Sequence, residues 1–340
     1  MMAKELPIAI KIRYLLIFLL ATVLLSCGDT ANKKVVYLHP SLSRARFVKD
    51  GSFMMERLKQ LGYDASMVDA DDNESLQIEK GIKLIDEGVD VLIVTPVNGN
   101  TIAPMIRYAK DKGVVVIAYN RLINNTDYDV FFTGDNINNG EILCNTTLSL
   151  CPTGNYVVLG GDRFDRNGVE LKQSIDSILA PHVAQGNVNI IYETFVEAYG
   201  AESTAYEFEQ IVQTWGSNID AVITCHDRMA TSVIDILKRN GMAGKVITTG
   251  QDATKEGVTN IKNGYQHVTI YHPHKKLGYA VADLAKSLIE GTKAREFTTY
   301  KTFNGYAQIP TVKVRSVTIT KDNYAKELIE TGEYKSSDLQ

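Results

Sequence analysis

Short runs of aliphatic and β-branched residues alternate with helical stretches along almost the whole chain, and this alternation restricts the possible fold more than any other feature. In the first half, the runs expected to form strands are 34–38, 65–68, 91–95 and 114–119. The helical stretches between them, 46–61, 74–87 and 102–112, are each followed directly by a glycine. Consecutive units of this kind predict a parallel sheet with helices on both faces.

The same alternation begins again in the second half. Strands are expected at 156–159, 188–192, 221–224, 246–249, 268–271 and 314–319. Helices are expected at 170–179, 202–214, 229–239, 257–263, 275–290 and 323–331. No Gly/Ser-rich or Pro-rich linker separates the halves, which favours lobes joined by several crossings of the chain. We therefore expect an α/β protein of two doubly wound parallel-sheet lobes.

The first 27 residues have the pattern of a secretion signal. Basic residues precede an apolar run at 14–25, which ends in Leu-Leu-Ser-Cys at Cys27. A run of this length is too short to span a bilayer core of about 30 Å, but it suits the central part of a signal peptide. A small residue before Cys27 resembles a lipobox, which implies acylation of Cys27 and a tether over 28–33. An uncleaved membrane anchor with an incidental cysteine is the alternative. Both predict a location in the cell envelope, periplasmic or on an outer leaflet.

Charge and motif content exclude several classes of function. The net charge is −4, with acidic and basic residues interspersed, so nucleic acid is not an expected partner. GxGxxG after the first strand, GxxxxGK[ST], GxSxG and HExxH are all missing, so an enzyme is disfavoured. The histidines are scattered and no Cys/His zinc spacing occurs, so neither a metal nor a cofactor is expected. Cys144 and Cys151 are too far apart on a helical pattern for a disulfide unless the end of the helix unwinds, and Cys225 is expected to be a core residue rather than a reactive thiol.

Polar side chains follow nearly every expected strand, where the loops of an open parallel sheet converge on a ligand. They are His39, Ser41, Asn98, Asn120, Arg121, Asp135, Asn136, Asp162, Arg163, His226, Asp227, Gln251, Asp252 and His272. Groups that each make two directed hydrogen bonds match the hydroxyls of a polyol. The aromatic residues Phe47, Phe164 and Tyr199 are suited to cover the apolar faces of a pyranose ring.

Helix capping is the competing interpretation of these polar residues. Asp135, Asn136 and Asp227 each stand just before a helix, where such side chains often cap and do nothing else. Capping does not explain Arg121, because an arginine that ends an apolar strand needs a partner for its largely desolvated charge. We therefore favour ligand contact for Arg121.

Several stretches resemble the type I periplasmic sugar-binding proteins of ABC importers, and among them the D-xylose-binding branch of the ribose/xylose family. They are "GVDVLIVTPVNG", "AYNRLIN", "GDNINNGE", "GNYVVLGGDRFDRNG" and "GQDATKEGVTNIKNGYQHVTIYHP". The resemblance implies a monomer whose two lobes are joined by three hinge crossings and close on one sugar. It also implies that lobe 1 comprises 33–137 and 271–303, and lobe 2 comprises 138–270 and 304–340.

The resemblance further implies a set of ligand-binding residues. Those that match the family pattern are Arg46 (with Phe47 as its aromatic neighbour), Arg121, Asn167 and Asp252. Four other positions depart from it: Asn120 replaces an Asp, Tyr199 a Trp, His226 an Asn and His272 a Lys. Because a site built for one hydroxyl pattern rejects others, these changes leave the identity of the sugar open.

Two functions remain compatible with such a pocket. The chain delivers a monosaccharide to an ABC permease, or it is a sensor that docks on a membrane histidine kinase or chemoreceptor. A repressor of related fold is excluded because a signal-like segment stands where its helix-turn-helix would be. If His226 and His272 face the ligand, affinity should vary between about pH 5 and 8.

Overall fold

The computed structural model describes residues 33–43, 45–297 and 300–339. The expected signal 1–27, with Cys27, and nearly all of the expected tether 28–33 lie outside these ranges. Within the ranges, none of the helices combines the length and the apolar character needed to cross a bilayer.

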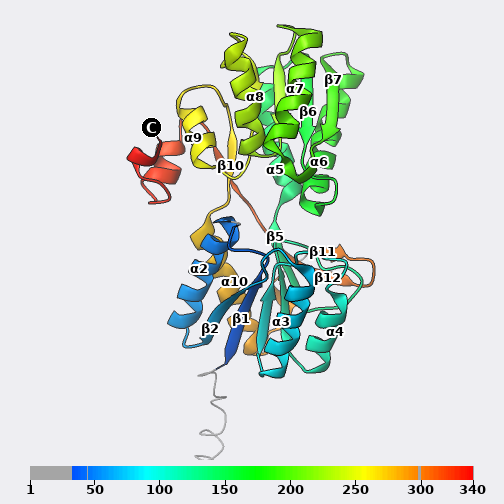
Figure 1. Ribbon diagram of the computed structural model, residues 1–340, viewed down its shortest axis with the longest axis vertical. Coiled ribbons are helices and arrows are strands. Elements are labelled where there is room, and N and C mark those ends of the chain that lie inside the picture. Colours follow the sequence, from blue (N-terminus) through cyan, green and yellow to red (C-terminus); the bar gives the residue numbers. More distant parts are fainter. Residues whose placement is uncertain (1–32, 44, 298–299, 340) are drawn as a thin grey trace, which may run out of the picture.

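Lobe 1 is a mainly parallel sheet covered by helices on both faces (Figure 1). Its strands have the order β11-β12-β5-β4-β3-β1-β2, and only β11 and β12 pair antiparallel. The strands are β1 (Lys34–His39), β2 (Asp64–Asp69), β3 (Val91–Val94), β4 (Val115–Tyr119), β5 (Val130–Gly134), β11 (Tyr300–Phe303) and β12 (Gln308–Val314). The helices are α2 (Ala45–Gln60), α3 (Glu74–Asp86), α4 (Ala103–Asp111) and α10 (His274–Ile289).

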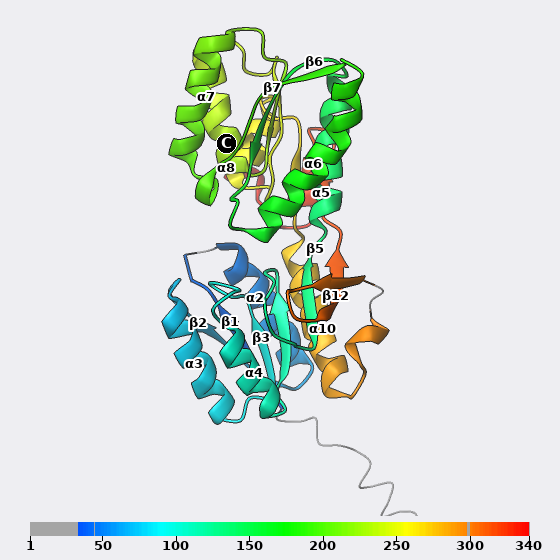
Figure 2. The same ribbon diagram turned by 90° about the vertical axis from the view of Figure 1, so that its right-hand side faces the viewer.

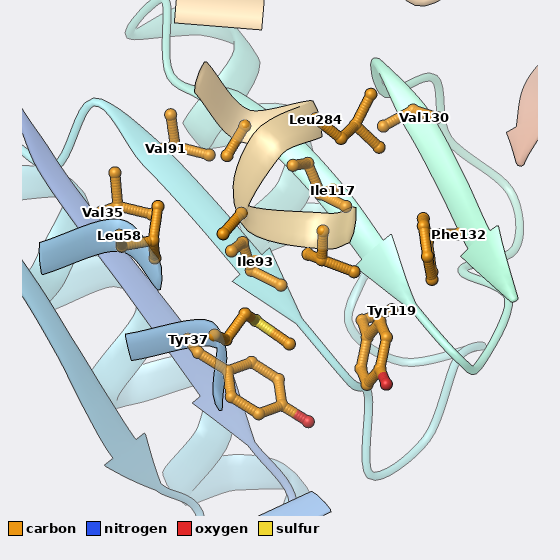
Figure 3. Close-up of a cluster of buried hydrophobic side chains, with 14 of the residues drawn as sticks. Val35, Tyr37, Leu58, Val91, Ile93, Ile117, Tyr119, Val130, Phe132 and Leu284 are labelled. Atoms are coloured by element: carbon orange, nitrogen blue, oxygen red, sulfur yellow. The ribbon is translucent and has the colours of Figure 1, made fainter. Parts of the chain in front are cut away.

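Alternate side chains of each central strand enter different cores of this lobe. Val91 and Ile93 of β3 lie in the core beneath α2 and α10, which Figure 3 shows. Leu92 and Val94 lie in the core beneath α3 and α4. Because both faces are covered, the strand is apolar at every position, as a buried parallel strand requires.

Lobe 2 repeats this plan with a smaller parallel sheet, in the order β7-β6-β8-β9. Its strands are β6 (Gly154–Gly160), β7 (Val188–Phe195), β8 (Ala221–Thr224) and β9 (Ile247–Thr248). Helices α5 (Asn136–Leu150) and α6 (Arg166–Ala184) cover one face, and α7 (Ala201–Trp215) and α8 (Asp227–Arg239) the other. Helix α9 (Lys255–Lys262) lies next to α8 (Figure 1).

In the described part of the chain, three segments connect the lobes, which are stacked along the long axis of the molecule (Figure 2). They are the passage from β5 to α5, the passage from β10 (Thr269–Tyr271) to α10, and the passage from β12 to β13 (Val317–Ile319). β10 and β13 pair antiparallel beside the sheet of lobe 2, where Ile270 lies in the same core as β6 and β8. A π-helical turn (Ala325–Ile329) and a final short helix (Ser336–Leu339) then pack against α9 and β13.

Two sequence expectations need correction. The boundary at 303/304 is wrong, because β12 pairs with β5 in the sheet of lobe 1 and the last crossing falls after Val314. The expected strand 314–319 is the end of β12 and a separate strand β13, interrupted at 315–316. The sequence gives a poor signal for β12, since Pro310 within it argues against an interior strand.

Candidate functional site

A cavity of about 810 Å³ lies between the lobes at the carboxyl ends of their strands. Lobe 1 lines it with the segments after β1, β2, β3 and β4, and lobe 2 with those after β6, β7 and β8. Among the residues expected to bind ligand, Arg121, Asn167 and Tyr199 line this cavity. Open α/β sheets bind ligands at this position.

Next to the cavity, Arg46 of lobe 1 meets Asp252 of lobe 2. A guanidinium nitrogen of Arg46 lies 3.5 Å from Asp252 Oδ1, and both side chains are about one quarter exposed. His226 Nε2 lies 3.1 Å from Asp252 Oδ2, and His272 Nε2 lies 3.3 Å from Asp252 Oδ1. Burial alone would raise the pKa of Asp252, but His226, His272 and Arg46 outweigh it and hold that pKa well below its usual range. We call these four residues the inner cluster.

The two histidines of the inner cluster are held differently. His226 caps α8: its Nδ1 accepts a hydrogen bond from the Arg228 backbone N–H at 3.0 Å, so its proton sits on Nε2, toward Asp252. Burial lowers the pKa of His226, but the contact with Asp252 outweighs burial and the pKa is raised. The Nδ1 of His272 lies 3.0 Å from the Ser316 hydroxyl, and burial together with Arg46 lowers the pKa of His272. His226 is therefore the more readily protonated of the two.

Several buried polar atoms at this site have no hydrogen-bond partner among the described residues. They are Arg46 Nε, Asp252 Oδ1 and His272 Nε2, together with Oε1 of Gln251, the residue before Asp252 in the chain. Buried polar atoms in folded proteins nearly always have a partner, so each such atom calls for an explanation. Together they offer donors and acceptors in a small space, which is what a ligand rich in hydroxyl groups would pair with.

A series of asparagines connects Arg46 of lobe 1 to Asn167 of lobe 2. Arg46 donates to Asn120 Oδ1 at 3.3 Å, and the Asn167 amide donates to the Asn120 carbonyl oxygen at 3.1 Å. The Asn136 amide donates in turn to Asn167 Oδ1 at 3.0 Å. Asn120 and Asn167 thus lie together across the lobes, as the resemblance implies for a shared site.

The aromatic residues occupy three different positions. Phe47 is buried beneath Arg121, whose guanidinium lies 5.8 Å from the ring centroid and donates to the carbonyl oxygens of Pro96 and Val97. Tyr199 donates from its hydroxyl to an Asp165 carboxylate oxygen at 3.2 Å, and its ring lies 5.9 Å from that of His226. Phe164 is 82% exposed in the wall of the cavity. Tyr199 therefore contacts the inner cluster through the ring of His226.

The loops that present these residues contain left-handed backbone at non-glycine positions. The φ angles are 62° at Asn120, 52° at Ala198, 53° at Tyr199, 86° at Asp252 and 46° at Ala253. Such conformations cost free energy and persist where the surrounding structure imposes them, commonly at binding sites.

The capping interpretation holds for one of the three residues to which it was applied. Asp135 caps α5 by accepting from the Asn138 N–H at 3.4 Å. Asp227 is instead a fully buried acceptor inside lobe 2, for the Thr254 N–H, the Gln266 amide and the Thr269 hydroxyl.

Asp50 belongs to the surroundings of the site although sequence reasoning does not select it. Its carboxylate is fully buried, accepts from the Tyr119 hydroxyl at 2.6 Å and lies 2.7 Å from His274 Nδ1. The oxygen that accepts from Tyr119 also lies 3.8 Å from Arg46 Nε, one helical turn earlier. That spacing of four residues is a sequence signal, but the partner His274 is 224 residues away.

Known proteins resemble this chain over nearly its whole length. The family model described as the periplasmic binding protein domain matches residues 35–293. The D-xylose-binding periplasmic protein of Escherichia coli K12 is 29% identical, over 97% of this chain and 100% of that protein. The multiple sugar-binding periplasmic receptor ChvE of Rhizobium radiobacter is 27% identical, over 88% of this chain and 90% of that protein.

Solved structures share the fold. An ABC transporter solute-binding protein from Clostridium phytofermentans with bound β-D-glucose has a TM-score of 0.79 at 24% identity, covering 90% of this chain and 100% of that chain. The myo-inositol-binding protein of Caulobacter has a TM-score of 0.72 at 21% identity, covering 91% and 100% respectively. The chain therefore belongs to the periplasmic binding protein family, with the two-lobed type I fold, and it is a binding protein rather than an enzyme.

Proposed function

We propose that this protein binds a monosaccharide between its two lobes and delivers it to an ABC importer in the bacterial envelope. The observation that carries the proposal is the inner cluster, in which Arg46 of lobe 1 meets Asp252 of lobe 2. Arg46 Nε and Asp252 Oδ1 of this pair, and His272 Nε2 beside it, are buried atoms that have no hydrogen-bond partner among the described residues. A ligand with many hydroxyl groups would satisfy them from both lobes at once.

The relatives support a xylose-like pentose or a related aldose as the ligand. Their names specify D-xylose or multiple sugars, and the structural neighbours include complexes with D-glucose, D-allose and myo-inositol. Asn120, Tyr199, His226 and His272 are the positions at which this site departs from the xylose-binding pattern. We assign the choice among sugars to these positions, because a buried group left unpaired by the wrong sugar penalises its binding.

Closure of the lobes is the step by which binding would be signalled. A ligand that contacts Arg46 and Asp252 together does so only when the lobes approach, so it shifts an open–closed equilibrium by its differential affinity. An importer would then distinguish the loaded protein from the empty one by the arrangement of its lobes.

The proposal places the protein at the membrane through acylation of Cys27, in the periplasm or on an outer leaflet. We expect the protein to incorporate an alkyne-labelled fatty acid and the Cys27→Ser variant to lose this label. Labelling that survives the substitution would contradict an anchor at Cys27. The name "receptor" of ChvE favours a second candidate, in which the loaded protein docks on a membrane sensor. Recovery of a permease or of a kinase with sugar-loaded protein decides between the two.

The first test is a thermal-shift screen of residues 28–340, which retain every described residue, against pentoses and hexoses. A ligand present at a hundred times its Kd adds about 2.7 kcal/mol to the free energy of unfolding. For a protein of this size that should raise Tm by several degrees. A rise with one or two sugars is expected; no rise with any monosaccharide would contradict the proposed ligand class.

A further inference from the structure

The C-terminal segment, residues 325–339, is attached to lobe 2 and also reaches lobe 1. Leu328 and Leu339 pack in one core with residues of α9 and β13, and Lys262 donates to the Leu339 carbonyl oxygen at 2.8 Å. On its other side the segment meets α2. Lys49 Nζ lies 2.7 Å from Glu333 Oε1 and 5.4 Å from the centroid of the Tyr334 ring.

Glu333 connects this contact to Arg46 through a series of polar and ionisable groups. Its second oxygen accepts from the Tyr271 hydroxyl at 2.8 Å, and its first lies 3.9 Å from His274 Nε2. His274 Nδ1 lies 2.7 Å from Asp50, whose other oxygen lies 3.8 Å from Arg46 Nε. Burial opposes ionisation of Glu333, but Lys49, His274 and Tyr271 outweigh it and lower its pKa, so the carboxylate is charged at neutral pH.

Tyr334 supports Asp252, the lobe 2 member of the Arg46–Asp252 pair. Its hydroxyl donates to the Ala253 carbonyl oxygen at 2.8 Å. Ala253 follows Asp252, and both residues have positive φ, 46° and 86°. A turn in this conformation relaxes unless its surroundings hold it, so the Tyr334 hydrogen bond restrains the backbone that presents the Asp252 carboxylate.

We propose that Lys49, Glu333 and Tyr334 form a latch between the lobes, which positions Arg46 and Asp252 and favours the lobe arrangement that binds ligand. None of the three lines the cavity, so Glu333 and Tyr334 are positioning residues that act through Arg46 and Asp252. The latch rests on the proposed function for its effect on affinity. Its effect on the arrangement of the lobes does not require any ligand. When the competent arrangement is less populated, the apparent Kd rises in proportion.

The test compares Glu333→Gln and Tyr334→Phe with the control Asp338→Asn in chains of residues 28–340. The control is the same acid-to-amide change on the same segment, but Asp338 contacts Lys255 of lobe 2 at 3.9 Å and the Lys335 N–H. Two quantities are measured: the Kd of the sugar found by the thermal-shift screen, and the radius of gyration of the ligand-free protein from small-angle X-ray scattering. We expect Glu333→Gln and Tyr334→Phe each to raise Kd by roughly fivefold to tenfold and to increase the radius of gyration. Asp338→Asn should change neither.

Lys49→Met gives an independent check of the same contact. It should raise Kd as Glu333→Gln does, and the double variant should lose less binding free energy than the sum of the two single losses, because both changes break the Lys49–Glu333 pair. Additive losses would overturn the latch. The latch would also be overturned if the single variants had Kd values within twofold of wild type and an unchanged radius of gyration. A lowered Tm would not alter that conclusion, because a merely structural role predicts this combination of results. If the wild-type chain binds no sugar, the proposed function fails, and the radius of gyration alone still decides on the latch.

Discussion

Replacement of Arg46 by methionine tests the inner cluster most directly. The guanidinium lies 3.5 Å from Asp252, donates to Asn120 at 3.3 Å, and keeps its buried Nε without a hydrogen-bond partner among the described residues. Methionine retains most of the aliphatic length of the side chain and removes every donor. A bound sugar would therefore lose its hydrogen bonds to this cation while the cleft keeps its shape.

We expect Arg46→Met to weaken binding by about 3 kcal/mol, which is roughly a 150-fold rise in Kd. A hydrogen bond to a charged group contributes about 1.5–3 kcal/mol, and Arg46 has more than one donor near the cleft. The free energy of unfolding should fall by less than this loss of binding free energy. Asp50 keeps its contacts with Tyr119 and His274, and Asp252 keeps both histidines.

Arg57→Met on the same helix is the matched control. Arg57 pairs with Asp283 at 2.8 Å, and these side chains are 32% and 48% exposed, away from the cavity. An exposed pair of this kind contributes at most about 1 kcal/mol to stability, and the change should leave sugar affinity unaltered. Titration calorimetry with the sugar from the screen gives Kd, and urea unfolding gives stability. A Kd for Arg46→Met within threefold of wild type would refute the assignment of Arg46 to the site.

Further predictions concern stability in urea. Gly278→Ala should lower the free energy of unfolding by about 1–3 kcal/mol, because the added Cβ would lie 2.6 Å from a backbone carbonyl oxygen of α2. Gly51→Ala should lower it by less, because the two atoms nearest to that added Cβ belong to the flexible end of a methionine. Equal losses for the two variants would contradict this reasoning. As pH falls from 8 to 5, His272→Gln should lose less free energy of unfolding than wild type, because the lowered pKa of His272 makes the unfolded chain bind more protons there. His226→Gln should lose more free energy of unfolding than wild type over the same pH range. The raised pKa of His226 gives wild type additional stability that is fully present below the ordinary histidine pKa of about 6.5, and the variant lacks it. Parallel pH profiles of stability would contradict both statements. Asp227→Ala should cost about 3 kcal/mol by leaving three donors without their acceptor, and a loss below about 1 kcal/mol would contradict that accounting.

Most elements of both lobes can be predicted from the sequence because buried parallel strands have a local signature. β8 has the bounds expected from its apolar run, 221–224. β11 and β12 lack that signature. β11 is short and largely exposed, and β12 carries a proline, so only their pairing with the rest of the sheet defines them. The lobe boundary at 303/304 is wrong for this reason.

The candidate site could be predicted in part because the residue after a parallel strand has a defined place in space. His226, Asp252 and His272 follow different strands, yet the fold brings them within contact distance. Asp50 has no such marker, since it lies within a helix and its partner His274 comes from the far end of the chain. The role of Asp50 therefore depends on tertiary contacts that the sequence does not indicate, whereas the residues that follow strands can be selected from the local sequence pattern.

The geometry of the inner cluster also explains how a sugar could supply the free energy for closure. Arg46 and Asp252 are each about one quarter exposed and 3.5 Å apart, so their attraction alone contributes only about 1 kcal/mol and does not hold the lobes together. Among the described residues, Gln251 Oε1 has no hydrogen-bond partner, and His272 Nε2 has only the long contact with Asp252 at 3.3 Å, and buried polar atoms left in this state cost free energy. A ligand that pairs these atoms removes that cost and keeps the attraction, so its binding shifts the equilibrium toward the closed arrangement. A sugar that lacks one matching hydroxyl leaves one of these atoms unpaired, and selectivity then follows from the same groups that drive closure.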